Sequence, residues 1–151
     1  AAFTLDELGG YLREARGGIQ PLWPDHCIIG TPGEGLDPRL DLSRATSIVR
    51  KGYRPAADSY SAFCENDALT TGLAESLTAK GIERVVVVGL AGDYCVLFTA
   101  IDAAEAGFEA IYLEELTRFV GLPEGSRVRS LQSLHDAGVT VISGIPQPEN
   151  G

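Results

Sequence analysis

The feature that most constrains this chain is a run of four valines, residues 85–88, which ends in Gly89 and leads to Cys95. An unbroken β-branched run is typical of a strand buried on both faces of a parallel sheet. The alanine-rich segment that follows, residues 96–106, has good helix formers and an apolar face at three- and four-residue spacing. The pattern therefore predicts a strand, a turn and a helix, with a thiol at the carboxyl edge of a sheet.

Cys95 is predicted to lie at the start of that helix. Unpaired backbone N–H groups and the helix dipole favour negative charge there, so they would stabilise a thiolate and a developing oxyanion. An ordinary thiol is mostly protonated at neutral pH, so a nucleophilic role also requires a neighbouring cation or base. Lys51 is the candidate, because it ends a predicted strand at the same sheet edge. On spacing alone, a buried structural cysteine and a solvated lysine remain the alternatives.

The composition favours one globular domain. The chain has 151 residues, 44% of them hydrophobic and 22% charged, which is enough for one core and too little for two. Its net charge of −9, with scattered Lys and Arg, argues against a nucleic-acid partner. We expect no membrane partner, because no apolar run is long enough to cross a bilayer. Three cysteines in such a domain favour free thiols in a reducing compartment, the cytoplasm.

Hydrophobic periodicity and the positions of Gly and Pro predict alternating strands and helices. Helices are predicted over residues 4–15, 67–80, 96–106 and 126–137, and strands over 46–51, 84–90, 109–113 and 139–143. Residues 21–38, with four prolines and three glycines, predict a loop, and the tail 145–151 is expected to fray. The alternation predicts a three-layer α/β/α fold with a mostly parallel sheet.

Several other residues are candidates for binding or support. His26 lies in a proline-stiffened loop and is a candidate metal ligand or acid/base group, or simply a loop histidine. Tyr60 lies in a polar, aromatic loop after Lys51, where it could stack on a flat ligand or cover the core. Cys27 and Cys64 lack metal-ligand spacing and are interpreted as ordinary thiols. Asp93 is predicted to cap the helix that carries Cys95.

Four segments together resemble the nicotinamidases of the isochorismatase-like cysteine hydrolase family. They are residues 23–33 (WPDHCIIGTPG), 51–52 (KG), 58–63 (DSYSAF) and 88–96 (VGLAGDYCV). The first and last are specific in combination, whereas Lys-Gly alone means little. The resemblance runs from about residue 21 to residue 143 and implies the family's Rossmann-like α/β/α fold.

The resemblance implies an enzyme that hydrolyses nicotinamide to nicotinate and ammonia through a Cys–Lys–Asp triad. Cys95 matches the nucleophile, which forms a thioester, and Lys51 matches the lysine that stabilises the thiolate and the charge of the intermediate. The backbone N–H groups of Ala91 and Cys95 match the family's oxyanion hole. A cis peptide bond is expected between Leu90 and Ala91.

The resemblance also implies substrate and metal contacts. Trp23 matches the aromatic residue that stacks on the pyridine ring, and Tyr60 lines the same pocket. Tyr94 and the backbone of Ala91 are assigned to substrate binding as well. His26 matches one ligand of a divalent metal ion, which is Zn, Fe or Mn in the family.

Two family motifs have no counterpart in this sequence. Family members open with a strand carrying Asp-x-Gln-x-Asp-Phe, whose first Asp completes the triad, and later carry Asp-x-His, which adds two metal ligands. The same region contributes two adjacent strands of the family's sheet. We therefore predict a single domain over residues 1–151 that lacks these strands and has most of its metal ligands outside this chain. The expected partners are a small-molecule amide substrate and either further copies of this chain or a complementing N-terminal segment. The missing strands and ligands would come from such a segment.

Two alternatives to a nicotinamidase stay open. Relatives that share the thiol and the lysine hydrolyse other amide or carbamoyl substrates. A catalytically inactive relative that acts as a binding or assembly module is the other. Because a catalytic zinc ordinarily takes three protein ligands, the 151 residues alone are predicted to bind metal weakly and to hydrolyse nothing at a useful rate.

Overall fold

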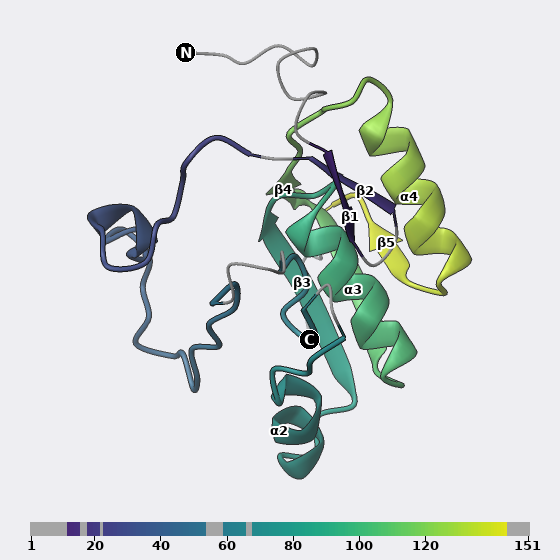
Figure 1. Ribbon diagram of the computed structural model, residues 1–151. Helices are drawn as coiled ribbons and strands as arrows, with labels where there is room; N and C mark the ends of the chain where they lie inside the picture. Colours follow the sequence, from purple (N-terminus) through teal and green to yellow (C-terminus); the bar gives the residue numbers. More distant parts are fainter. Residues whose placement is uncertain (1–11, 16–17, 22, 54–58, 66–67, 145–151) are drawn as a thin grey trace. The chain divides into compact units, whose positions relative to one another are not determined.

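The computed structural model describes residues 12–15, 18–21, 23–53, 59–65 and 68–144 (Figure 1). The chain separates into two compact units, residues 1–48 and residues 49–151. Cys95 and Lys51 belong to the second unit, and His26 belongs to the first. Within the described ranges, no helix is long and apolar enough to cross a membrane.

The second unit is built on a parallel three-stranded sheet. Its strands are β3 (Arg84–Leu90), β4 (Glu109–Arg118) and β5 (Thr140–Ile142), in the order β3-β4-β5. Val85 lies opposite Ala110 in the register of the first pair. The strands predicted over residues 84–90, 109–113 and 139–143 are thus confirmed, and β4 continues beyond its predicted end.

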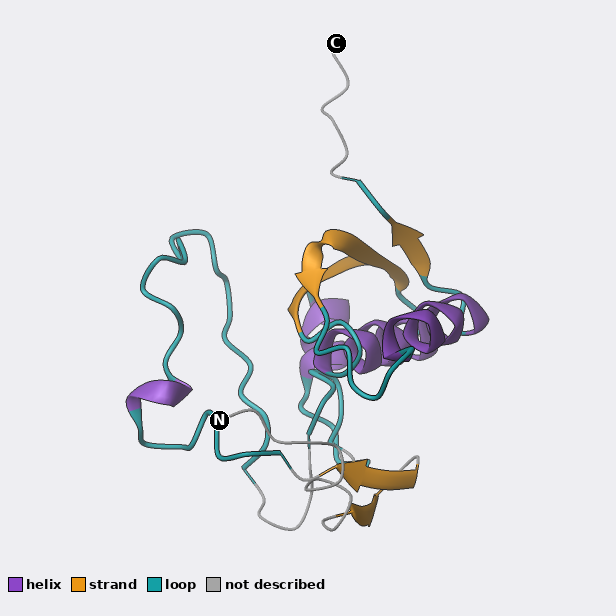
Figure 2. Ribbon diagram, turned by 90° about the horizontal axis from the view of Figure 1, so that it is seen from above, coloured by secondary structure: helices purple, strands orange, loops and turns teal. Residues whose placement is uncertain are grey.

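Two helices cover one face of this sheet. They are α3 (Cys95–Glu105), which packs on β3 and β4, and α4 (Ser126–Asp136), which packs on β5 and beside α3 (Figure 2). Both were predicted, with boundaries that differ by at most one residue. The core between the layers consists of Phe63, Val96, Leu97, Ala100, Ala103, Phe108, Ala110, Tyr112, Leu134 and Val139.

The other face of β3 is open. Val86, Val88 and Leu90 are 55%, 45% and 73% exposed, while Val85 and Val87 are half-buried against the core. The prediction that both faces of the valine run are buried is therefore wrong for this chain. The reason is that α3 covers one face only, and within the described residues β3 pairs with β4 alone.

Two predicted elements of the second unit differ from the structure. Residues 46–51 have no regular secondary structure, because no described strand pairs with them. The helix predicted over residues 67–80 begins only at α2 (Leu73–Ala79), and residue 67 lies outside the described residues. Thr70 pairs with Cys64 in an antiparallel bridge, and Ala68 has a φ of 70°, which is incompatible with an α-helix.

The first unit contains a two-stranded antiparallel pair, β1 (Leu12–Ala15) and β2 (Gly18–Pro21). The helix predicted over residues 4–15 is therefore wrong at its C-terminal end, where cross-strand pairing overrides a weak helix propensity; residues 4–11 lie outside the described residues. The loop predicted over residues 21–38 is confirmed apart from the last residue of β2 and a short 3₁₀ helix, η1 (Pro32–Glu34). The tail 145–151 also lies outside the described residues.

Candidate functional site

The structure brings together the Cys95 thiol and the Lys51 amine, which the sequence predicted to be neighbours. Lys51 Nζ lies 3.6 Å from Cys95 Sγ, and both side chains are partly buried. Cys95 is the first residue of α3, directly after the turn that follows β3. An ammonium group at this distance places a positive charge beside the sulfur, and partial burial strengthens its electrostatic interactions by reducing solvent screening.

The segment that carries Lys51 contacts residues 59 and 65. Lys51 Nζ donates to the backbone carbonyl of Ser59, a short bond that fixes the end of the lysine side chain. The next residue, Gly52, has a φ of 78° and donates its N–H to Glu65 Oε1 at 3.4 Å. Glu65 is only 8% exposed. Sequence reasoning gave Ser59 no role although it lies in the quoted segment 58–63, because its contact is made by the backbone carbonyl. It missed Glu65, which lies outside the quoted segments.

The turn before Cys95 has the predicted backbone. The Leu90–Ala91 peptide bond is cis, as expected. The carbonyl of Ala91 accepts the N–H groups of Tyr94 and Val96, both at 3.0 Å, which closes the turn onto the start of α3. The N–H groups of Ala91 and Cys95, the predicted oxyanion-hole donors, therefore flank one tight turn.

Aromatic rings lie beside the helix that begins at Cys95. Tyr60 stacks on Phe98, with ring centroids 5.5 Å apart and an interplanar angle of 14°. Tyr60 also meets Tyr94 at 5.5 Å in a tilted arrangement. Burial, followed by the charge of Asp93, raises the pKa of Tyr94 to about 12. Phe98 was not predicted, although its position three residues after Cys95 places it on the same side of the helix.

Asp93 does not have the role predicted from sequence. The residue that precedes α3 as its N-cap is Tyr94, and no side chain caps the helix. The Asp93 carboxylate instead accepts hydrogen bonds from the loop after β4 and from Ser126, the first residue of α4. The prediction rested on local spacing, whereas the partners lie far along the chain.

The other two cysteines, Cys27 and Cys64, are free thiols. All three cysteines are within the described residues and none forms a disulfide. Cys27 is exposed, and Cys64 Sγ donates to Asp102 Oδ2 at 2.9 Å. These environments agree with their interpretation as ordinary thiols.

His26 and Trp23 belong to the first unit. His26 is exposed, and its Nδ1 lies 2.7 Å from the carbonyl oxygen of Pro24. A hydrogen on Nδ1 would leave Nε2 with the lone pair that a metal needs. Trp23 is half-buried. No group of three His, Cys, Asp or Glu residues in the described part of the chain could hold a metal ion, so these residues do not form a metal centre by themselves.

Comparison with known proteins identifies the family of this chain. A model described as the isochorismatase domain matches residues 18–145. The chain belongs to the isochorismatase family. The predicted resemblance is thus confirmed, and so is the α/β fold with its parallel sheet.

Relatives of this isochorismatase-family chain include proteins described as nicotinamidases. The nicotinamidase of Acinetobacter baylyi is 44% identical over 127 residues, which are 83% of this chain and 59% of that protein. PnC1 from L. infantum, solved in complex with nicotinate, has a TM-score of 0.77 and 42% identity, covering 84% of this chain and 62% of that one. The pyrazinamidase of Pyrococcus horikoshii, solved in complex with zinc, has a TM-score of 0.69 and 31% identity, covering 82% and 64%. This chain spans less than two thirds of each.

Proposed function

We propose that this chain carries the nucleophile and its cationic partner in an amidohydrolase that converts nicotinamide to nicotinate and ammonia. The observation that carries the proposal is the 3.6 Å contact between Lys51 Nζ and Cys95 Sγ at the start of α3. The choice of substrate is supported by the relatives described as nicotinamidases and by the nicotinate complex.

In the first chemical step, the thiolate of Cys95 attacks the carboxamide carbon of nicotinamide. A C–S bond forms, and the carbonyl electron pair moves to oxygen. The N–H groups of Ala91 and Cys95 donate to that oxyanion. Loss of one such donor typically raises the barrier by about 2.7–4 kcal/mol. The Lys51 ammonium stabilises the thiolate before attack and the negative charge after it.

The intermediate then breaks its C–N bond. The proton that the thiol gave up leaves with the amine as ammonia, and a thioester remains on Cys95. Water hydrolyses the thioester to nicotinate and restores the thiol. We assign the acid that moves these protons to the triad aspartate, which has no counterpart in this sequence and which another segment would supply.

The flat ring of the substrate suits the aromatic residues. Tyr60 and Tyr94 meet each other beside Cys95 and Phe98, so their rings can cover a pyridine ring held near the thiol. We also assign Trp23 to this ring, as the resemblance implies. His26, with Nε2 available, is proposed as one ligand of a divalent metal whose other ligands lie outside this chain. The zinc complex of the Pyrococcus pyrazinamidase supports that assignment.

We further propose that both units form one domain that another segment completes. The family model extends across both units, from residue 18 to residue 145. The open face at Val86, Val88 and Leu90, on a strand paired within the described residues only with β4, is the kind of surface that proteins cover. An N-terminal segment or another copy of the chain would cover it. Thiols outside disulfides support a reducing compartment, the cytoplasm.

A chimera tests the proposal. This chain is joined to the part of the Acinetobacter nicotinamidase that lies outside the matched region. Ammonia release is then measured from nicotinamide, pyrazinamide and N-carbamoyl amino acids. We expect the chimera to release nicotinate and ammonia in equal amounts, and the chain alone to release little. If a folded chimera hydrolyses the N-carbamoyl amino acids faster than nicotinamide, nicotinamide is not the preferred substrate. A folded, inactive chimera in which Cys95 is alkylated no faster than Cys27 and Cys64 would support the inactive module.

A further inference from the structure

Asp93 is buried and makes three long-range hydrogen bonds. It is 5% exposed, and its two carboxylate oxygens accept the N–H of Val120 and the N–H of Gly121, both at 2.9 Å, and the hydroxyl of Ser126 at 2.7 Å. These donors come from the loop after β4 and from the first residue of α4. A buried carboxylate with this many donors is fixed in position, because leaving any of them unpaired is costly.

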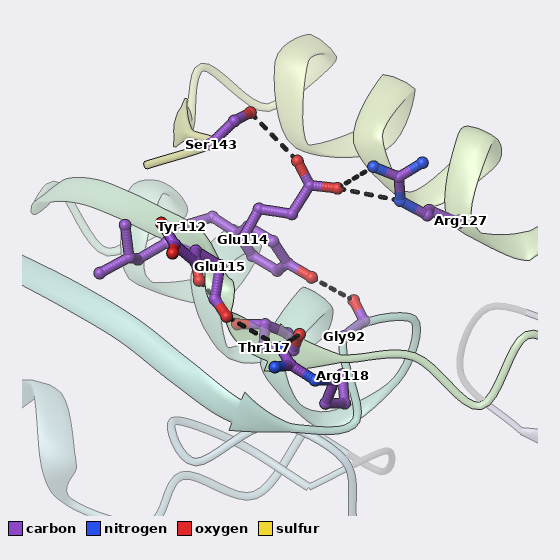
Figure 3. Close-up of polar contacts among 9 residues, drawn as sticks. Gly92, Tyr112, Glu114, Glu115, Thr117, Arg118, Arg127 and Ser143 are labelled. Atoms are coloured by element: carbon purple, nitrogen blue, oxygen red, sulfur yellow. Dashed lines mark hydrogen bonds and ion pairs between the residues drawn. The ribbon is translucent and has the colours of Figure 1, made fainter. Parts of the chain in front are cut away.

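The neighbouring residue, Gly92, is held from the other side by β4. Its N–H donates to the carbonyl of Arg118 at 2.8 Å, and its carbonyl accepts the hydroxyl of Tyr112 at 3.2 Å (Figure 3). Burial raises the pKa of the Tyr112 hydroxyl, so it stays a donor. A Cβ at position 92 would meet Tyr112 Oη at 2.5 Å and Thr117 Cγ2 at 2.8 Å. The turn between β3 and α3 is thus bonded to β4 at residue 92 and to the next loop at residue 93.

We propose that Asp93 is a positioning residue for Cys95: its carboxylate anchors the turn so that the sulfur stays within reach of Lys51. This inference rests on the function proposed above. Tyr94 adds to the same anchor, because its hydroxyl donates to the carbonyl of Leu122 at 2.7 Å. Lys51 comes from a distant segment, so its 3.6 Å contact with the sulfur depends on where the turn holds the start of α3.

The charge of Asp93 and its anchoring role act on the thiolate in opposite directions. A carboxylate two residues from the sulfur repels a thiolate, so removing its charge alone would favour ionisation of Cys95. Loosening the turn would separate the sulfur from the Lys51 ammonium and would disfavour ionisation. The direction of the change in reactivity therefore separates the two roles.

The test measures iodoacetamide alkylation of Cys95 by peptide mapping across a pH series, in the chain and in the chimera described above. For Asp93→Asn we expect the profile to move to higher pH and the rate at neutral pH to fall about three- to tenfold. Ser126→Ala keeps the charge and removes one hydrogen bond. We expect the same direction and a fall of about twofold. If Asp93→Asn does not fold, the alkylation profile of Ser126→Ala tests the inference by itself.

Glu114→Gln is the matched control. Its carboxylate also joins separate elements, accepting hydrogen bonds from Arg127 and Ser143, and it is not part of the turn (Figure 3). The variant should lower the melting temperature and leave the Cys95 profile unchanged. A profile for Asp93→Asn that is unchanged or moves to lower pH, with Ser126→Ala unchanged, would overturn the inference.

Lys51→Met, measured in the same series, separates this inference from the proposed function. If Lys51→Met slows Cys95 alkylation and the Asp93 and Ser126 variants do not, only the positioning role fails. If Lys51→Met has no effect either, the proposed pairing of amine and thiol fails.

Discussion

Cys95 stands at the junction of a strand and an eleven-residue helix, whereas Lys51 stands in a segment without regular secondary structure. The turn on the cysteine side is bonded to β4, to the next loop and to α4 through residues 92–94. On the lysine side, the partners include the Ser59 carbonyl and the Glu65 carboxylate. Cys95 is therefore positioned by regular elements of the folded core, and Lys51 by a segment without regular secondary structure.

The largest effect is expected from the nucleophile itself. Cys95→Ser replaces the thiol by a hydroxyl that ionises far less readily. Nicotinamide hydrolysis by the chimera should therefore fall about a thousandfold or more. The measurement is ammonia release under saturating substrate. Cys27→Ser, at an exposed thiol, is the matched control and should retain activity. Equal losses in both variants would remove Cys95 from its assigned role.

The next effect tests the cation. Lys51→Met keeps the length of the side chain and removes its charge, so Cys95 loses the positive group 3.6 Å from its sulfur. Iodoacetamide alkylation of Cys95 at neutral pH should slow about tenfold. Lys80→Met, at an exposed lysine, should leave the rate unchanged. If both variants slow alkylation alike, the effect is one of net charge and not of the contact.

A backbone substitution tests the fixed side of the site. Gly92→Ala places a Cβ within 2.5 Å of Tyr112 Oη and 2.8 Å of Thr117 Cγ2, so the turn or β4 must move. We expect the free energy of unfolding to fall by about 1–3 kcal/mol in urea denaturation. Gly144→Ala, where nothing lies within 4 Å of the added atom, is the control and should be neutral. A neutral Gly92→Ala would mean that the turn is not tightly packed.

The smallest effect is expected on the lysine side. Glu65→Gln weakens the already long 3.4 Å hydrogen bond from Gly52, which supports the residue next to Lys51. We expect alkylation of Cys95 to slow by about twofold, because the neutral Gln oxygen is a weaker acceptor than a carboxylate and the bond is already long. Glu75→Gln, on an exposed position of α2, provides the comparison. If Glu65→Gln slows Cys95 alkylation more than Asp93→Asn does, the contacts on the lysine side matter more than those on the cysteine side.

Local patterns predicted the elements around Cys95 well. The valine run, the alanine-rich helix and the glycine after it agree with β3 and α3, because periodicity and helix stops are local properties. Lys51 was placed near Cys95 by assuming a strand over residues 46–51. The proximity is confirmed although that strand is absent. The sheet edge explains the position of Cys95, whereas Lys51 reaches it from a segment without regular secondary structure, for a reason other than the one predicted.

Other features depended on distant parts of the chain and could not be predicted. The partners of Asp93 lie 27 to 33 residues away, so its spacing to α3 pointed to a helix cap instead. The open face at Val86 and Val88 depends on what covers β3, which residue type alone does not specify. The pairing that makes Leu12–Ala15 a strand likewise overrides its local helix signal.

The most direct test of the central claim is a titration of the Cys95 thiolate by its ultraviolet absorbance. It is performed in a Cys27→Ser, Cys64→Ser background, with and without Lys51→Met. The account predicts that Lys51→Met moves the transition to higher pH, because the substitution removes the positive charge 3.6 Å from the sulfur. A transition that does not move with Lys51→Met would contradict it.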